Sequence, residues 1–172
     1  MEKIKTENQN KTETQKKICC PIFNPEKYDN KVHNWNKKSF LKESIFTIFH
    51  MPIPWTINKK IKSLCNQAKN NNIEYKLEDT LILFEDTSAF KSNIYLSTTN
   101  SIPTENNIEI SGKFLSKVYD GPYKDTPKFI IQMNEYLKEQ NKTAKKYYIH
   151  YAYCPKCSKK YSHNYMVLFA EI

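Results

Sequence analysis

The pattern of apolar and polar side chains is clearest between residues 107 and 140. From residue 108 to residue 119 the two kinds of side chain largely alternate, which predicts a half-buried strand. The sequence Asp-Gly-Pro-Tyr at 120–123 predicts a tight turn, and Thr126-Pro127 predicts the start of a helix. Apolar side chains then recur at helical spacing, at Phe129, Ile130, Met133 and Leu137. This stretch predicts a strand, a turn and a helix packed back against a sheet.

Weaker patterns predict the remaining elements. Further strands are expected at residues 44–51, 80–86, 93–99, 145–153 and 164–172. A helix is expected after Asn58, with one apolar face formed by Ile61, Leu64, Cys65 and Ala68. The order strand–helix–strand–strand then occurs twice. This order predicts an α+β domain of two pseudo-duplicated units, with helices packed on one side of an antiparallel sheet.

The chain divides into a tail and one domain. Residues 1–17 are almost entirely polar and are expected to be disordered. Residues 18–172 are expected to form the domain, and residues 18–43 an irregular segment that Trp35 and Phe40 anchor to the core. The chain has only two glycines, Gly112 and Gly121, which we expect where the backbone needs a positive φ or close approach.

Charge and hydropathy exclude several classes of protein. The net charge is 27 − 18 = +9, but no basic recognition motif accompanies the lysines, so nucleic-acid binding is not expected. No apolar run approaches the ~20 residues of a membrane span. No hydrophobic segment begins the chain, so we expect a cytoplasmic protein with reduced cysteines.

The cysteines form a candidate metal site. Cys154 and Cys157 have the Cys-x-x-Cys spacing that supplies half of a tetrahedral zinc site. The other half could come from Cys19 and Cys20, or from one of them with His163. Two alternatives remain open: the thiols pack the N-terminal segment onto a hairpin without metal, or they form a redox pair. The sequence therefore predicts either no cofactor or a structural zinc ion.

Other candidate site residues are carboxylates, a histidine and aromatic rings. Strand-end carboxylates can bind a cation or position a water, and a histidine can act as a base; these catalytic candidates are Glu85, Asp86 and His50. Tyrosines offer apolar walls with a polar tip, and many crowd residues 147–165. The alternatives are solvated turn carboxylates, a hydrogen-bonded core histidine and ordinary packing of the rings.

Residues 111–114 and 118–123 carry a family resemblance. With the element order, they resemble the GyrI-like effector-binding family, which has a glycine before the fourth strand and a Gly-Pro-Tyr turn before the second helix. Residues 19–25 and 154–157, with Tyr161, Asn164 and Tyr165, are similar to a bacterial branch often labelled hydrolase. Some relatives are described as hydrolases that open cyclopropane-bearing toxins.

The resemblance implies a pocket between the two halves, lined by aromatic rings and often holding one acidic residue. The implied ligand is a small, largely apolar or aromatic compound, either neutral or cationic. The expected ligand-binding residues are Tyr123, Tyr119, Phe90, Tyr151 and Tyr165. Tyr123 matches the family turn, and Phe90 stands where the family has a tryptophan. Binding of such a compound is the first functional hypothesis, hydrolysis of a reactive toxin is the second, and binding of a protein partner is the third.

Overall fold

The computed structural model describes residues 20–73 and 78–172; the expected disordered tail, residues 1–17, lies outside this part. The strands are β1 (Lys31–Ile48), β2 (Met51–Pro52), β3 (Ile82–Ser88), β4 (Lys91–Ser97), β5 (Asn107–Asp120), β6 (Lys146–Tyr151) and β7 (Tyr165–Glu171). The helices are α1 (Pro54–Asn70), α2 (Thr126–Glu139) and α3 (Pro155–Tyr161), with short 3₁₀ turns η1 (Pro25–Lys27) and η2 (Tyr123–Asp125). None of the helices in the described ranges is long and apolar enough to cross a membrane.

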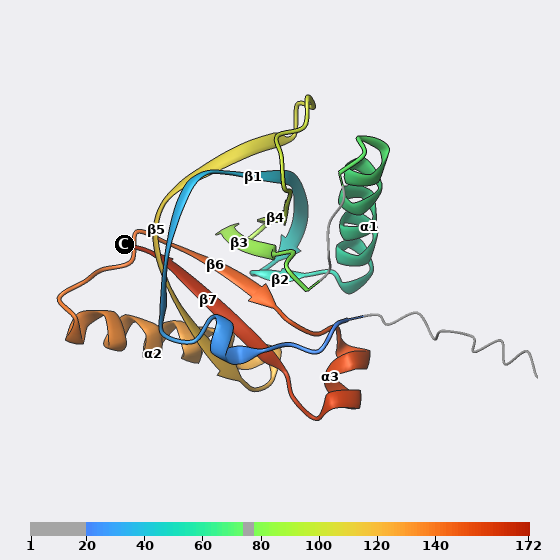
Figure 1. Ribbon diagram of the computed structural model, residues 1–172. Coiled ribbons are helices and arrows are strands. Elements are labelled where there is room, and N and C mark those ends of the chain that lie inside the picture. The colour runs from blue at the N-terminus through green and yellow to red at the C-terminus, as the bar shows by residue number, and fades with distance from the viewer. Residues whose placement is uncertain (1–19, 74–77) are drawn as a thin grey trace, which may run out of the picture.

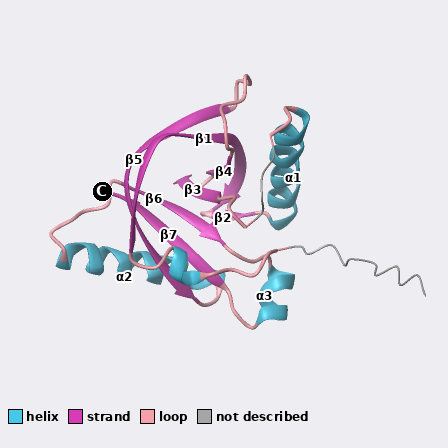
Figure 2. Cartoon of the chain, in the orientation of Figure 1, coloured by secondary structure: helices cyan, strands magenta, loops and turns pink. Residues whose placement is uncertain are grey.

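Six strands form a closed antiparallel barrel (Figure 1 and Figure 2). Neighbours pair in the order β1-β4-β3-β6-β7-β5, and β5 pairs back onto β1. Both halves use the same internal order, β1-β4-β3 and β5-β7-β6, and equivalent strands join them. The predicted order of elements is therefore found, with β2 and α3 added. The closure of the sheet was not predicted.

Strand β1 explains the closure. It begins at Lys31 rather than Ser44, so the prediction of an irregular segment at residues 18–43 is wrong from Lys31 onwards. A bulge between Trp35 and Lys38, where Lys37 has a φ of 49°, interrupts the alternation. The inserted residue puts the side chains that follow it out of phase with those before it. The alternation of apolar and polar residues along β1 is therefore not visible in the sequence. The long strand pairs with β5 through its first part and with β4 through its second.

The barrel interior is filled by a largely aromatic core. Trp35 contacts Phe114 with ring centroids 4.1 Å apart, so it anchors the chain as expected, but from within β1. Tyr28, just after η1, enters the core and packs edge to face on Phe169 at 6.0 Å. The buried members are Tyr28, Phe40, Leu81, Leu83, Tyr95, Ile110, Phe114, Tyr148, Val167 and Phe169.

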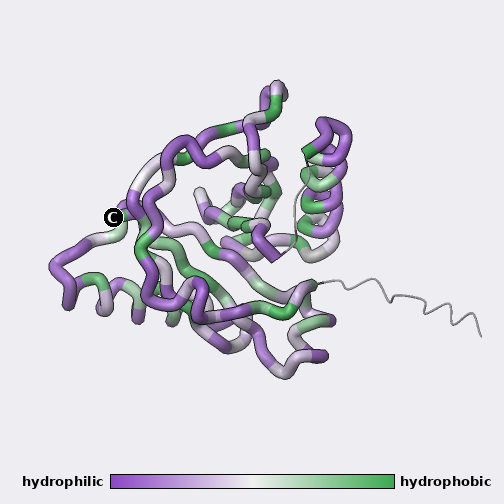
Figure 3. Tube along the Cα trace, in the orientation of Figure 1, coloured by the Kyte–Doolittle hydropathy of each residue, from purple (hydrophilic) through white to green (hydrophobic). Residues whose placement is uncertain are grey.

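Both long helices pack on the outer face of the barrel, at different places (Figure 1). The α1 cluster comprises Leu41, Ile45, Leu64, Ala68, Ile94, Leu96 and Ile102. The α2 cluster comprises Leu115, Tyr119, Phe129, Met133, Leu137, Ile149, Met166, Leu168 and Ala170. Figure 3 shows hydrophobic residues along the strands that α2 covers and hydrophilic ones on the turns of both helices that face away. Each fully buried Leu or Phe contributes about 1.5–3 kcal/mol.

The two glycines serve different purposes. Gly112 has a φ of +153° and lies opposite Trp35 across the β1–β5 pair. Gly121 does not have a positive φ, but it meets the other expectation, close approach of a neighbouring group. A Cβ at Gly121 would lie 2.9 Å from Phe129 Cζ, so the turn needs glycine for space. The ring of Phe129 occupies that space because it stacks on Tyr119 at 4.8 Å.

Candidate functional site

Two aromatic side chains mark the line where the halves meet on the outer face of the barrel. The equivalent strands β3 and β6 pair there, with Phe84 opposite Ile149. Phe84 packs with the α1 cluster and Tyr151 with the α2 cluster. Their rings meet edge to face with centroids 5.2 Å apart. We call the surface formed by Phe84, Tyr151, Tyr123, Asp86 and His50 the seam.

Tyr123 extends the row of rings. Its ring meets Tyr151 edge to face at 5.4 Å, and its hydroxyl donates to the Tyr153 carbonyl at 2.7 Å. Burial, and after it the nearby thiols, raise the pKa of Tyr123 to about 12. Burial also raises the pKa of Tyr151; a hydrogen bond with Thr126 opposes this, and the Asp86 carboxylate adds to it. Both phenols stay protonated at neutral pH. Tyr123 uses its proton on the Tyr153 carbonyl, so the phenol that can donate to a ligand is that of Tyr151.

His50 and Asp86 form a close pair at one end of the seam. His50 Nδ1 lies 2.6 Å from Asp86 Oδ2, and the side chains are 58% and 47% exposed. Asp86 follows Phe84 by two residues on β3, so both side chains share the outer face. When Nδ1–H is donated to the carboxylate, Nε2 keeps its lone pair and can accept a proton. This is the geometry of a general base that a carboxylate orients.

The turn that carries His50 has an unusual backbone. Phe49 and His50 join β1 to β2, with φ of 48° and 67°. Consecutive positive φ values are typical of a type I′ hairpin turn, which favours asparagine and glycine. Other residues in this region cost about 1–3 kcal/mol each. The His50 backbone N–H donates to the Ala89 carbonyl at 2.9 Å, which holds the imidazole beside the end of β3.

Glu85 lies on the opposite face of β3, inside the barrel, and is 7% exposed. Its carboxylate accepts hydrogen bonds from the Tyr95 hydroxyl, from Asn93 at 3.0 Å and from Lys146 at 3.0 Å. Burial alone would raise the pKa of Glu85, but these three donors outweigh it and hold the pKa below its ordinary value. The structure therefore separates Glu85 from Asp86: the first supports the core and only the second reaches the seam.

Phe90 stands beside the His50 turn. It lies in the connection between β3 and β4, and its ring is 5.9 Å from Phe49 and 6.4 Å from Phe46. The Phe90 side chain is 54% exposed, so it extends the apolar surface next to His50. This is where the structure places the ring that stands for the family tryptophan.

The other two candidate tyrosines lie away from the seam. Tyr119 is buried beneath α2, where it stacks on Phe129. Tyr165 stacks on His163 at 4.8 Å, beside an open hollow of about 590 Å³. His163 Nδ1 lies 2.6 Å from Asp120 Oδ2, so His163 pairs with a carboxylate and is not part of the thiol cluster.

Sequence analysis missed a close serine–histidine pair inside the barrel. His33 Nε2 lies 2.7 Å from Ser116 Oγ, which itself lies 2.5 Å from the Tyr28 carbonyl. The serine hydroxyl has one proton and donates it to Tyr28, so His33 donates to Ser116. Burial and then Lys38 lower the pKa of His33. A fully buried serine that donates elsewhere is not an activated nucleophile, and the pair was hidden because β1 was expected to begin later.

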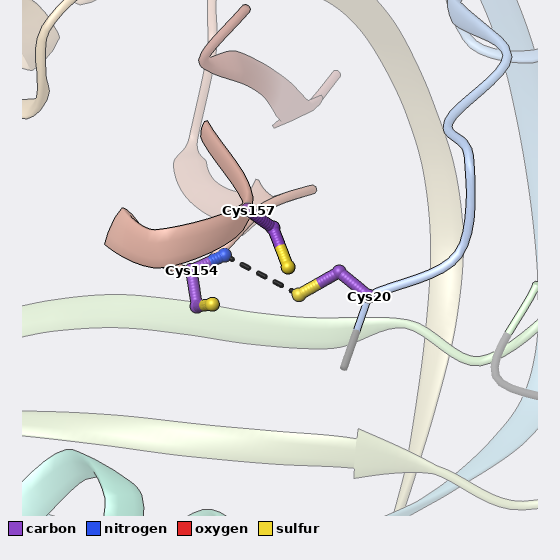
Figure 4. A group of neighbouring side chains, drawn as sticks. All are labelled: Cys20, Cys154 and Cys157. Carbon is purple, nitrogen blue, oxygen red and sulfur yellow. Dashed lines mark hydrogen bonds between the residues drawn. The ribbon is translucent and has the colours of Figure 1, made fainter. Parts of the chain in front are cut away.

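Three cysteines meet near the other end of the seam (Figure 4). Cys20 precedes η1, Cys154 caps α3 and Cys157 lies in its first turn, with all three sulfurs within 4.8 Å of one another. The Cys154 N–H donates to Cys20 Sγ at 3.4 Å. Burial raises the pKa of Cys20, and the hydrogen bond from Cys154 opposes this. The predicted ligand Cys19 lies outside the described residues, and Cys65 packs against the α1 cluster.

Comparison with known proteins adds a family and a fold. The family described as Bacterial hydrolase matches residues 10–172. A hydrolase from Listeria innocua has a similar structure (TM-score 0.57, 12% identity, 84% of this chain and 92% of that one). An uncharacterized conserved protein from the same organism is equally similar (TM-score 0.57, 11% identity, 83% and 92%). A search of curated proteins found no match. At these identities the structures share the fold with this chain.

Proposed function

Because this chain belongs to the bacterial hydrolase family, we propose that it hydrolyses a small, largely apolar or aromatic compound bound on the seam. The observation that carries the proposal is the 2.6 Å contact between His50 Nδ1 and Asp86 Oδ2, at the end of a row of rings in which Phe84 and Tyr151 are half-buried and Tyr123 is exposed. The three cysteines take no part in this reaction.

The seam suits a flat ligand. Phe84, Tyr151 and Tyr123 are fixed edge to face, so a ring laid along them meets apolar walls, and the Tyr151 hydroxyl adds a polar group. An aromatic contact of this kind contributes about 0.5–1.5 kcal/mol beyond burial, and a cationic ligand gains about 0.5–2 kcal/mol over a ring. Asp86 adds negative charge at the same end as His50.

The chemistry follows from the proton positions. Nε2 of His50 removes a proton from a water molecule, and the Asp86 carboxylate stabilises the imidazolium that forms. The water oxygen bonds to an electrophilic carbon of the ligand, and the bond from that carbon to its leaving atom breaks. The leaving atom then takes the proton from His50, so one water is added and His50 returns neutral. General base catalysis of this kind contributes about 10²–10⁴ in rate.

The duplicated strand order supports membership of the GyrI-like superfamily. Its ligand modules bind compounds between their two halves, and the seam lies at that position here. The row of rings favours a second candidate function, in which the chain binds an aromatic or cationic effector without turnover. Both functions use the same surface, and they differ only in whether His50 acts on the ligand.

A screen of aromatic cations and of aromatic electrophiles, including strained-ring compounds, tests the proposal. Fluorescence identifies the compounds that bind, and mass spectrometry of the recovered compound shows whether it has gained one water. We expect hits whose affinity falls in Tyr123→Ala. The parent protein should convert them either to one ring-opened product heavier by one water or to two fragments whose masses add up to the compound plus one water. If every electrophilic hit is recovered unchanged, hydrolysis is overturned and binding without turnover is left. If Tyr123→Ala leaves the affinity of every hit unchanged, the seam is not the binding site.

A further inference from the structure

We propose that Cys20, Cys154 and Cys157 bind one zinc ion, which fastens the N-terminal segment to the connection between β6 and β7. This inference does not depend on the proposed function, because it concerns the opposite end of the seam from His50. It rests on three thiols that two distant segments bring together (Figure 4).

The positions of the sulfurs fit a thiolate metal site. Cys154 and Cys157 are separated by about one helical turn, so their side chains project from the same side of the start of α3. Cys20 arrives from the opposite direction, and its sulfur and those of the two helix residues lie within 4.8 Å of one another. A tetrahedral site with zinc–sulfur bonds of ~2.3 Å holds its sulfurs ~3.8 Å apart. Small side-chain rotations close the difference.

The surroundings of the thiols favour a metal over simple packing. Cys157 is 5% exposed, and the Cys154 N–H points at Cys20 Sγ, as expected of a donor to a thiolate ligand. Three thiolates and one Zn²⁺ carry a net charge of −1, and α3 supplies three lysines close by in the sequence Pro-Lys-Cys-Ser-Lys-Lys-Tyr. Soft thiolate ligands select zinc over hard cations.

The segment around Cys20 is tied to the same hairpin by other contacts. The Phe23 N–H donates to the Tyr153 hydroxyl at 3.0 Å, and the Tyr161 hydroxyl donates to the Cys20 carbonyl at 3.4 Å. Tyr153 is also the residue whose carbonyl accepts from Tyr123. One ion at the three sulfurs would therefore hold the N-terminal segment and stiffen the Tyr123 end of the seam.

The test is metal analysis of the full chain purified under reducing conditions. We expect about one zinc per chain, and thiolate-to-cobalt charge-transfer absorption when Co²⁺ replaces zinc. Cys154→Ser and Cys157→Ser should lose both signals, and Cys65→Ser, which alters a thiol on α1, should keep both.

Two results would overturn the inference. One is metal-free protein that shows no charge-transfer band when Co²⁺ is added. The other is a disulfide between these cysteines, detected as a loss of two mass units that a reductant restores. Should Cys154→Ser fail to fold, zinc release from the folded parent protein on blocking its thiols with a mercurial gives the same answer. Neither result bears on hydrolysis at His50.

Discussion

Replacing Glu85 by glutamine removes the charge from a carboxylate that accepts hydrogen bonds from three side chains inside the barrel. Glutamine keeps the shape, but it offers one oxygen where the carboxylate had two. Its amide nitrogen then faces a donor, either Lys146 or the pair Tyr95 and Asn93. A hydrogen bond to a charged group contributes about 1 kcal/mol more than a neutral one. The contacts from Tyr95 and Asn93 become neutral and the ion pair with Lys146 is lost. Together these changes give an expected loss of about 3 kcal/mol in the free energy of unfolding.

The expected loss can be measured by urea unfolding and by thermal melting. For a chain of this size, each kcal/mol lowers the melting temperature by about 2–4 °C, so Glu85→Gln should melt about 6–12 °C lower. Asp86→Asn is the matched control, because it changes the adjacent carboxylate on the solvent face. Its exposed pair with His50 contributes about 0–1 kcal/mol, so that variant should melt close to the parent.

The pH dependence of this difference has a definite sign. The pKa of Glu85 in the folded protein lies below its ordinary value of 4.5. A depressed carboxyl pKa stabilises the fold above the unfolded-state pKa, and this stabilisation is lost as the pH falls through the folded-state value. The gap between the parent and Glu85→Gln should therefore be largest near neutral pH and shrink below about pH 4.5. Equal melting of Glu85→Gln and Asp86→Asn at neutral pH would refute the assignment of the two carboxylates to opposite faces.

Two further predictions concern the turn after β5. Gly121→Ala should lower the free energy of unfolding by about 1–3 kcal/mol, because its Cβ would lie 2.9 Å from Phe129 Cζ. If the variant unfolds at the same urea concentration as the parent, the close packing of Phe129 on Gly121 is contradicted. Tyr123→Phe removes the hydrogen bond to Tyr153 and should cost about 1 kcal/mol of stability while sparing ligand affinity. Tyr123→Ala also removes the ring and should weaken binding about tenfold, or 1.4 kcal/mol, so equal affinities of the two variants would contradict a role for the ring.

Local patterns predicted much of the fold. The apolar stripe of residues 129–137 predicted the buried side of α2, and Leu64 and Ala68 lie on the buried side of α1 as expected. These predictions succeeded because helical periodicity is a local property of the sequence. The order of elements followed for the same reason.

Local patterns could predict neither the closure of the barrel nor the residues that form the seam. Both depend on pairings between distant residues, such as Trp35 with Gly112 and Phe84 with Ile149. A bulge conceals the first part of β1, and a single residue decides which way a strand side chain points. For this reason Glu85 and Asp86 were both predicted as catalytic candidates, although only Asp86 reaches the seam.

The strained turn at His50 also escaped prediction. Phe49 and His50 are not residues that a type I′ turn favours, and nothing local distinguishes them from the end of a strand. Their conformation is fixed by hydrogen bonding to the connection between β3 and β4, which lies far along the sequence. The partner of His50 therefore became visible only in the folded chain.

The rate at which His50→Gln hydrolyses a compound found in the screen tests the central claim most directly. His163→Gln is its matched control, because His163 Nδ1 also lies 2.6 Å from a carboxylate oxygen, that of Asp120, but away from the seam. We predict that His50→Gln binds the compound as the parent does and hydrolyses it about 10²–10⁴ times more slowly, whereas His163→Gln hydrolyses it at the parental rate. Parental turnover by His50→Gln, or an equal loss in both variants, would contradict the account.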